Sequence, residues 1–461
     1  GRTEKRATAT LWLLMKRPLH EAIKSLRGGA NFAMPGHRGR VAFDFDFGDD
    51  WTEVTGADNL LDPTEAIAEA QAEIAAAYGV KKSVIVPAGS TTGIKLALYL
   101  ALKPGEKILI QRNSHQSLFH GAVALDLHLS YLPANVDEAT GLFGGVDPAD
   151  VERALDGDPS IAAVFLTSPD YFGGGLKLKE IADIVHARNK ILIVDEAHGA
   201  HWAFTPLAKF SAVNYADYTV QSLHKTMAAL TGAALLHING HVDEKKLLKG
   251  MGLFLSTSPS YLLMLSSEYA VAAGKDLDWE KLLRHRARIE RNLPQLAVVK
   301  ARGPFMACED PMKFLFHLPG YRGDDVVSLL AEEGVYLEMG DGYYALAILS
   351  PYHEDEDVDR LIRAIHSLPK KEEMSGFEKG IYPETEAVFR PREAFFAETE
   401  IVSIDEAKGR VAAQNITPYP PGIPVVIYGE RITEEVIQAI KGRKDIPGFE
   451  GGKITVIKEA L

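Results

Sequence analysis

Short apolar runs alternate with longer amphipathic stretches between Ser83 and His237. Unbroken apolar runs of this kind are typical of strands that are buried on both faces of a sheet. The stretches between them carry apolar residues at helical spacing, which predicts crossover helices. The pattern therefore predicts a mainly parallel α/β domain. The predicted strands are residues 83–86, 107–110, 161–166, 191–194, 218–221 and 233–236.

Two helical patterns flank this region. Residues 65–78 are rich in Ala and Glu and are followed by Gly79, which is typical of a helix C-cap, and residues 279–293 predict a long, charged helix. A second α/β unit follows at about 300–368, and the Lys-, Glu- and Gly-rich stretch 370–382 resembles a linker. We therefore expect an N-terminal segment 1–60, a large domain 61–285, a small α/β domain 286–370 and a C-terminal domain 371–461.

Composition limits the function. The chain has 461 residues, 46% of them hydrophobic and 25% charged, as in a soluble globular protein of several domains. Its net charge of −13 disfavours binding to nucleic acid or to an anionic membrane. Cys308 is the single cysteine, so no intrachain disulfide can form, and a reducing, cytoplasmic location is expected. The apolar run 9–15 lacks the long apolar region of a signal peptide, and we interpret it as part of a first helix.

A loop of glycine and hydroxyl residues at 87–93 joins the first predicted strand to the next helix. Backbone N–H groups at a helix N-terminus, together with the hydroxyls of Ser90 and Thr91, form an anion site suited to a phosphate. The loop lacks the Gly-Lys-Ser/Thr of a Walker motif. Taken alone, it also fits an ordinary helix cap with a glycine turn at Gly89.

The predicted strand 191–194 leads directly into Asp195-Glu196-Ala197-His198. A carboxylate at the end of a buried strand needs a cationic partner, because an unpaired buried charge is costly. A protonated pyridine nitrogen would be such a partner. The alternatives are a helix-capping role for Asp195 or a metal site formed by His198 and His201.

Lys225 and His115 occupy equivalent places after other strands. Lys225 lies in Ser222-Leu223-His224-Lys225-Thr226, about thirty residues after Asp195, and can serve as a Schiff-base amine if its surroundings lower its pKa. Most lysines are instead solvated at the surface. His115 follows the strand 107–110 and can stack on a flat ring, although a lone histidine is more often a loop or core residue.

Each of these signals is weak by itself. In the order phosphate loop, histidine, aspartate and lysine, with each group at a strand end, they describe a site for pyridoxal 5′-phosphate (PLP). In this interpretation Lys225 carries PLP as a Schiff base.

The motifs resemble those of the Orn/Lys/Arg decarboxylase family, and in particular its short bacterial members. They extend over nearly the whole chain, and their combination is specific. The matching segments are 35–38 (Pro-Gly-His-Arg), 52–58 (Thr-Glu-Val-Thr-Gly-Ala-Asp), 89–91 (Gly-Ser-Thr), 112–115 (Arg-Asn-Ser-His), 195–199 (Asp-Glu-Ala-His-Gly), 222–225 (Ser-Leu-His-Lys), 257–261 (Thr-Ser-Pro-Ser-Tyr) and 419–424 (Tyr-Pro-Pro-Gly-Ile-Pro).

The resemblance implies a fold-type-I PLP enzyme, with a mainly parallel large domain and smaller α/β C-terminal domains, that decarboxylates ornithine, lysine or arginine. It implies that Lys225 forms the Schiff base, that Asp195 pairs with the pyridinium nitrogen and that His115 stacks on the ring; these three are the expected catalytic residues. No metal is expected. The expected cofactor-binding residues are Gly89, Ser90, Thr91, His115, Asp195, Ala197, His198, Ser222, His224 and Lys225.

The resemblance also implies a homodimer or higher homo-oligomer with shared active sites, in which residues 256–258 approach the phosphate of the neighbouring subunit. The substrate is expected to be a small basic amino acid, with Lys225 or a neighbouring histidine returning a proton to Cα.

Departures from the family pattern affect the substrate. Gln116 stands where the family usually has Lys, residues 58–64 differ from the usual Asp-Asp-Leu-His, and Asp170 replaces Thr in Pro-Thr-Tyr. A cationic substrate side chain needs a carboxylate. The candidates are Glu53, Asp58, Asp62, Glu338 and Asp341.

Two other functions remain open from the sequence. An aminotransferase or aldolase-type lyase would use the same cofactor but would produce a different product, and a clamp by arginine on the α-carboxylate would favour the aminotransferase. A non-catalytic relative that binds or regulates a partner is disfavoured by the presence of both Lys225 and Asp195.

Overall fold

The computed structural model describes residues 16–372, 383, 385–418, 423–441, 446, 449 and 452–458. The expected first helix at 9–15, most of the linker 370–382 and the Tyr-Pro-Pro-Gly part of the motif at 419–424 lie outside these residues. In the described part of the chain, no helix is long and apolar enough to cross a membrane.

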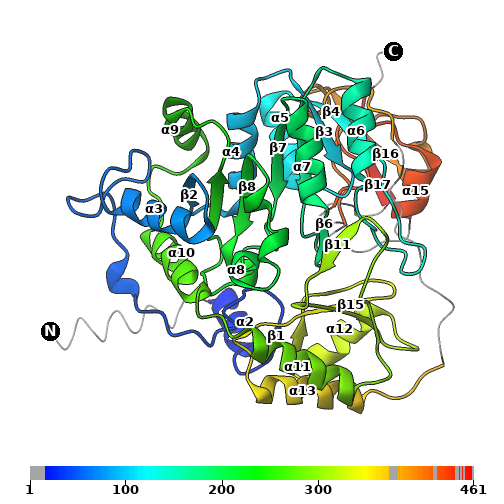
Figure 1. The fold of residues 1–461 in the computed structure, drawn as a ribbon. Helices are drawn as coiled ribbons and strands as arrows, with labels where there is room; N and C mark the ends of the chain where they lie inside the picture. The colour runs from blue at the N-terminus through cyan, green and yellow to red at the C-terminus, as the bar shows by residue number, and fades with distance from the viewer. Residues whose placement is uncertain are drawn as a thin grey trace.

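A seven-stranded sheet forms the centre of the large domain (Figure 1). All strands run parallel except β9, which is antiparallel to both of its neighbours. The six strands predicted from the apolar runs are all present, and the mainly parallel α/β fold is confirmed. In spatial order the strands are β2 (Lys82–Val86), β9 (Ala234–Ile238), β8 (Tyr218–Ser222), β7 (Ile191–Asp195), β5 (Ile161–Thr167), β3 (Lys107–Gln111) and β4 (His128–Leu132).

Helices cover both faces of this sheet because successive side chains of each strand point to opposite faces. In β5, Ala163 and Phe165 pack into one hydrophobic cluster and Val164 and Leu166 into the other. The first face is covered by α3 (Ala66–Tyr78), α4 (Gly89–Ala101), α5 (Gln116–Leu125), α9 (Glu244–Phe254) and α10 (Tyr261–Gly274), and the second by α6 (Pro148–Gly157) and α7 (Leu178–Ala187). Gly79 ends α3 with a φ of 69°, as the predicted C-cap requires.

The second unit packs α11 (Trp279–Asn292), α12 (Gly323–Glu332) and α13 (Asp355–Ser367) around an antiparallel sheet with its own hydrophobic cluster. The order in this sheet is β10 (Ala297–Val298), β12 (Lys313–His317), β15 (Ala345–Ile348) and β14 (Met339–Gly340).

Two further strand pairs connect segments that are distant in sequence. After α2 (Pro18–Ser25), β1 (Ala30–Phe32) pairs in parallel with β13 (Val335–Leu337), so the N-terminal segment joins the second unit. The pair of β6 (Gly174–Leu176) and β11 (Met306–Glu309) joins the second unit to the large domain.

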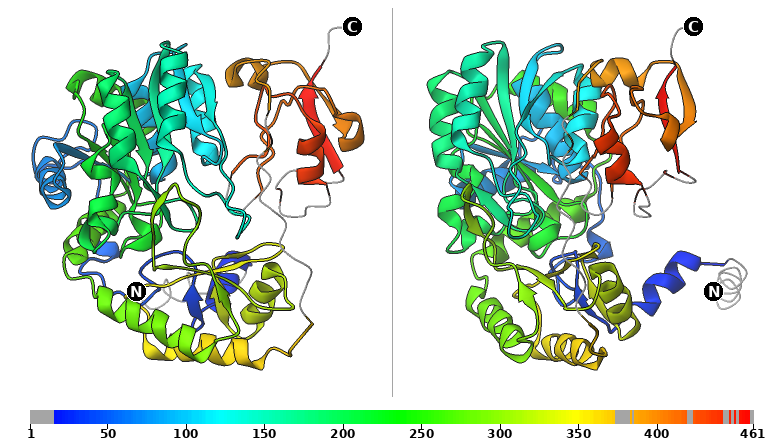
Figure 2. Two further views of the ribbon diagram at one scale, coloured as in Figure 1. Left: turned by 45° about the vertical axis from the view of Figure 1, so that its right-hand side comes forward. Right: turned by 90° about the vertical axis from the view of Figure 1, so that its right-hand side faces the viewer.

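The C-terminal unit contains α14 (Pro391–Phe395), α15 (Glu434–Ile440) and the antiparallel pair of β16 (Thr399–Ser403) and β17 (Lys453–Ile457) around a separate core. It lies beside the large domain (Figure 2). Arg112, which follows β3, anchors it: the guanidinium donates to the carbonyls of Pro424 and Val425 at 3.0 and 2.7 Å and pairs with buried Glu430 at 3.2 Å. Short 3-10 helices complete the described elements at Phe47–Asp49, Trp202–Phe204, Ala208–Phe210, Ala212–Asn214 and Ile404–Glu406.

Candidate active site

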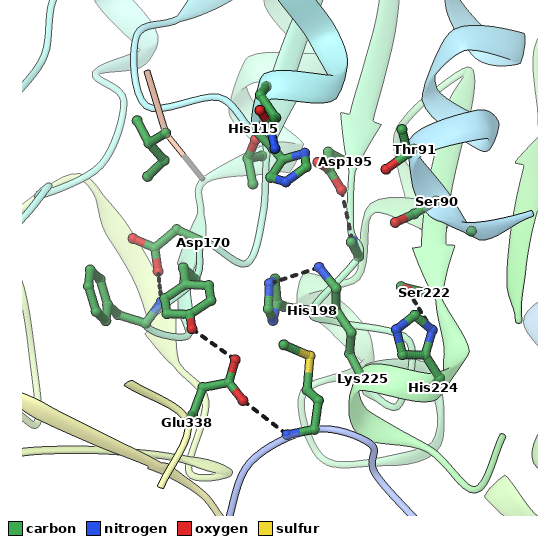
Figure 3. Close-up of a pocket in the computed structure, with 18 of the residues that line it drawn as sticks. Ser90, Thr91, His115, Asp170, Asp195, His198, Ser222, His224, Lys225 and Glu338 are labelled. Carbon is green, nitrogen blue, oxygen red and sulfur yellow. Dashed lines mark hydrogen bonds between the residues drawn. The ribbon is translucent and has the colours of Figure 1, made fainter. Parts of the chain in front are cut away.

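One cavity of about 630 Å³ lies beyond the carboxyl ends of the central parallel strands (Figure 3). Glu338 from the second unit and Ile423 from the C-terminal unit complete its wall. The sheet brings together every residue that the sequence predicted for the cofactor, as the rule for parallel α/β sheets requires. These are Gly89, Ser90, Thr91, His115, Asp195, Ala197, His198, Ser222, His224 and Lys225.

Asp195 is the last residue of β7 and is 3% exposed. Its Oδ1 accepts a hydrogen bond from the backbone N–H of Ala197 at 3.0 Å. Burial raises the pKa of this carboxyl, although the charge of Lys225 opposes the shift. Among the described residues, no basic side chain lies within ion-pair distance of Asp195. A cation held in the cavity would therefore provide the partner that this buried carboxylate lacks.

Lys225 lies on the short helix α8 (Leu223–Thr226), directly after β8, the strand that neighbours β7. Its Nζ is 3.2 Å from Nε2 of His198. Burial lowers the pKa of Lys225, although the charges of Asp195 and Glu338 oppose the shift. A lysine with a lowered pKa is more often neutral, and only the neutral amine attacks an aldehyde.

The N-terminus of α4 has the properties of a phosphate site. Gly89 begins the helix with a φ of +78°, and the preceding residue gives no side-chain cap to the free N–H groups. Ser90 and Thr91 add hydroxyls beside them. On the same side of the cavity, Ser222 Oγ lies 3.1 Å from His224 Nδ1, and burial followed by the charge of Lys225 lowers the pKa of His224 to about 4.

His115 is held in one orientation at the start of α5. Its Nδ1 accepts the backbone N–H of Ser117 at 3.2 Å and lies 2.9 Å from the hydroxyl of the same residue. Burial, followed by the charge of Lys225, lowers the pKa of His115 to about 4. The ring is therefore neutral at pH 7, and Nε2 carries the proton because Nδ1 accepts.

These groups fit the parts of PLP. The buried carboxylate of Asp195 matches a protonated ring nitrogen, the buried amine of Lys225, whose pKa is lowered, matches an aldehyde, and the uncapped N-terminus of α4 matches a phosphate.

Only one of the five carboxylates considered for the substrate side chain lines the cavity, and it is Glu338. Asp58 instead caps α3, accepting the backbone N–H groups of Glu65 and Ile67 at 2.9 Å each. Asp341 closes a turn by accepting the N–H groups of Tyr343 and Tyr344. Glu53 and Asp62 lie outside the lining.

Several residues that were not among the predicted site residues lie in or beside the cavity. Lys313 of β12 places its Nζ 2.9 Å from Nδ1 of His198, and Tyr171 donates to Glu338 at 2.8 Å. Asp170, noted as a departure from the family pattern, pairs with Arg302 at 2.8 Å. The sequence motif Pro-Asp-Tyr could have indicated that Asp170 and Tyr171 lie near the site. No sequence motif marks Lys313, which belongs to a different unit.

His201 does not join His198 in the cavity lining. Its Nε2 lies 3.0 Å from Oδ2 of Asp310 inside the core, and Trp202 donates to the same carboxylate oxygen at 3.0 Å. The geometry therefore separates the two histidines that were considered as a metal pair.

A mainly parallel sheet with a buried carboxylate ending one strand, a lysine following the next and a glycine loop opening a helix defines a fold-type-I PLP enzyme. The E. coli constitutive lysine decarboxylase has the same fold, with a TM-score of 0.76 at 22% identity over 89% of this chain and 75% of that one.

Family models agree with this class. Residues 18–301 match the Orn/Lys/Arg decarboxylase major domain, and residues 375–452 match its C-terminal domain. The uncharacterized protein YaaO of Bacillus subtilis (strain 168) is 32% identical over 92% of this chain and 94% of its own length. An arginine decarboxylase of the same organism is 30% identical over 92% of both chains. The chain belongs to the Orn/Lys/Arg decarboxylase family and is a PLP-dependent decarboxylase.

Proposed function

We propose that the chain removes the α-carboxylate of arginine as carbon dioxide and releases the corresponding amine, agmatine. Decarboxylation of a basic amino acid follows from the family. The choice of arginine is supported by the name of the Bacillus subtilis relative and by the surroundings of one residue, Glu338.

The carboxylate of Glu338 is held by two hydrogen bonds, one from a side chain and one from a backbone N–H. Its Oε1 accepts the hydroxyl of Tyr171 at 2.8 Å, and its Oε2 accepts the backbone N–H of Met34 at 2.9 Å. Each carboxylate oxygen accepts two hydrogen bonds, so one acceptor position on each oxygen is left for a ligand. Two parallel N–H groups of a guanidinium match such a pair of acceptors, whereas an ammonium group binds as a point charge.

Glu338 and the N-terminus of α4 lie on opposite sides of the cavity, with Lys225 and His198 between them (Figure 3). A substrate whose α-amino group is held near Lys225 would therefore extend its side chain toward Glu338. This direction supports a long, cationic side chain as the feature that the enzyme recognises.

The residues would divide the work as follows. When bound, PLP supplies an electron sink that makes loss of the α-carboxylate feasible. Asp195 would hold the positive charge of the ring nitrogen, and Ser90, Thr91 and the N–H groups of α4 would hold the phosphate. Lys225 would hold the cofactor between turnovers, and the neutral ring of His115 would cover it.

The test is a comparison of amine products. Purified, PLP-loaded protein is supplied with arginine, lysine or ornithine, and carbon dioxide and the amine are quantified. We expect agmatine as the main product. Glu338→Gln keeps the shape but removes the charge, and we expect kcat/KM for arginine to fall by about 10- to 100-fold, since hydrogen bonds to charged groups contribute about 1.5–3 kcal/mol.

Glu53→Gln is the matched control, because it removes the same charge from an exposed residue outside the cavity lining. Equal losses in both variants would contradict the role of Glu338. Faster turnover of lysine or ornithine than of arginine would overturn the choice of substrate. A keto acid product would favour an aminotransferase, and a Lys225→Ala variant that keeps full function in cells would favour a non-catalytic role.

We also propose a homodimer with shared active sites, located in the cytoplasm. Residues 256–258 are exposed and do not line the cavity of their own chain, so they are available to a neighbouring subunit. The helix α2 projects away from the second unit (Figure 2) and leaves Leu19 and Ile23 74% and 55% exposed. An exposed apolar helix face of this kind supports contact with another chain.

A further inference from the structure

His198 lies between two buried lysines that come from different units of the protein. Its Nε2 is 3.2 Å from Nζ of Lys225, and its Nδ1 is 2.9 Å from Nζ of Lys313 (Figure 3 shows the Lys225 contact). Lys313 is 3% exposed and His198 is 6% exposed. The three side chains therefore form one continuous row from Lys313 of the second unit to Lys225 of the large domain.

The donors and acceptors in these two contacts limit how many protons Lys313, His198 and Lys225 can hold together. Burial, followed by the charges of Lys225 and Lys313, lowers the pKa of His198 well below its usual value, so its ring is neutral and has one donor and one acceptor nitrogen. If Lys313 is protonated it donates to Nδ1, and the ring proton must be on Nε2. Nε2 then donates to Lys225, which must be neutral to accept. One extra proton is thus shared along the row.

Lys313 can hold this proton at neutral pH. Burial lowers the pKa of Lys313 to about 8, against the charges of Glu338 and Asp310, which raise it. Charged and titratable groups from several elements face Lys313. They are His198 (after β7), Lys225 (α8), Glu338 (between β13 and β14), Asp170 (after β5) and Asp310, which precedes Lys313 in the turn before β12. His198 is further faced by His115 and His224.

Lys313 also reaches a second cavity, which the active site does not use. This cavity has a volume of about 320 Å³ and shares Phe172 with the wall of the active-site cavity. Its wall includes Lys313, the carboxylates Glu290, Glu309 and Asp310, and the cations Arg286, Lys300 and Arg302. Lys313 thus contacts His198 through its amine and also borders a second cavity whose walls carry both acidic and basic side chains.

We propose that Lys313 is the proton reservoir of the active site and that His198 relays its proton to Lys225. The proposal rests on the proposed function, because decarboxylation replaces a carboxylate on Cα by hydrogen and so consumes one proton in each turnover. In the relay, one N–H bond breaks at Lys313 while one forms at Nδ1 of His198, and the Nε2–H bond breaks while one forms at Lys225. Lys313 then regains a proton from solvent water.

The test uses the full-length, PLP-loaded protein and three variants. Lys313→Met removes the charge and the hydrogen bond, and Lys313→Gln keeps a donor for His198 but has no proton to give. Lys300→Met is the control, because Lys300 lines the same second cavity but is exposed and paired with Glu290 at 2.8 Å. PLP content and thermal unfolding check that each variant is folded.

Two quantities are measured. The absorbance of bound PLP is titrated between about pH 6 and 10 without substrate, because it reports protonation of the nitrogen of Lys225. We expect Lys313→Met to raise the midpoint by about one unit, a tenfold change, since a neighbouring positive charge and the donated Nε2–H are lost. We expect a clearly smaller shift in Lys313→Gln and none in Lys300→Met.

The second quantity is the split between kcat and KM. We expect kcat to fall by about 100-fold in both Lys313 variants with KM within about threefold of wild type, as general acid–base groups contribute 10²–10⁴-fold. Wild-type kcat in Lys313→Gln would overturn the relay, as would an unchanged midpoint in Lys313→Met or an equal shift in Lys300→Met. If Lys313→Met does not fold, Lys313→Gln decides through kcat. A wild-type protein without amine product would reject the proposed function, whereas the absorbance titration would still judge the Lys313–His198–Lys225 contact.

Discussion

The side chain of Arg302 shows how a single residue joins the two units behind the active site. It is fully buried, and its guanidinium donates to both oxygens of Asp170 at 2.8 and 3.0 Å and to both oxygens of Glu309 at 3.0 Å. Burial lowers the pKa of Arg302, but the charges of Asp170 and Glu309 outweigh it and raise the pKa overall. Arg302 and Asp170 therefore both stay charged inside the protein, and their ion pair holds the loop that carries Tyr171.

Replacing Asp170 by Asn should destabilise the protein. Breaking a buried ion pair costs about 3–5 kcal/mol, and because Glu309 still neutralises Arg302 we expect the lower end of this range, about 3 kcal/mol. Chemical denaturation measures the change in the free energy of unfolding. Asp183→Asn is the control, since Asp183 pairs with Lys179 at an exposed site and should change stability by less than about 1 kcal/mol. An Asp170 variant as stable as this control would contradict a structural role for the pair.

At the level of residues, the sequence predicted that the ten cofactor-binding candidates lie together, because each follows or ends a predicted strand and parallel strands collect such residues at one edge, and all ten line one cavity. It could not place Lys313, because Lys313 begins a strand of another unit and meets His198 only after the two units pack. It also could not choose among five carboxylates, since only tertiary packing brings Glu338 to Tyr171 and Met34.

At the level of elements, the buried strands were predictable because they are continuously apolar. The strand β4 was missed, since it lies at the edge of the sheet and most of its side chains are partly exposed. The antiparallel direction of β9 was not visible either, because an apolar run carries no information on direction. Short strands such as β1 and β13 depend on each other for their hydrogen bonds and have no local pattern.

One motif gains its explanation only from packing between elements. Gly36 donates its N–H to the carbonyl of His224 at 2.7 Å, and a Cβ at this position would lie 2.5 Å from the carbonyl oxygen of Met227. Only glycine allows this close approach to the helix that carries Lys225. The Pro-Gly-His-Arg segment therefore holds Met34 and its contact with Glu338 against α8.

At the level of the whole molecule, we propose that the chain is divided into an N-terminal segment and three domains, with the bounds 1–60, 61–285, 286–370 and 371–461. The separate hydrophobic cores of the large domain, the second unit and the C-terminal unit support it. Arg112 links the C-terminal unit to the loop of His115, so that unit also contributes to the wall of the cavity through Ile423.

Shared active sites can be tested by mixing two inactive chains. One carries Lys225→Ala, and the other carries alanine at residues 256–258. If each site of a dimer combines Lys225 of one chain with residues 256–258 of the other, an equal mixture refolded together should recover about a quarter of wild-type activity, because half of the dimers are mixed and each has one intact site. Recovery of no activity would contradict sharing, and full activity of the alanine chain alone would show that residues 256–258 are not required.

The central claim, that Lys225 is the residue that carries PLP, has a direct test. The PLP-loaded protein is treated with borohydride, which fixes the link between lysine and cofactor, and the labelled peptide is located by mass spectrometry. The account predicts a single label, on Lys225, because its amine is buried in the cavity that Asp195 and the N-terminus of α4 also line. A label on Lys313, on another lysine, or on none would contradict it.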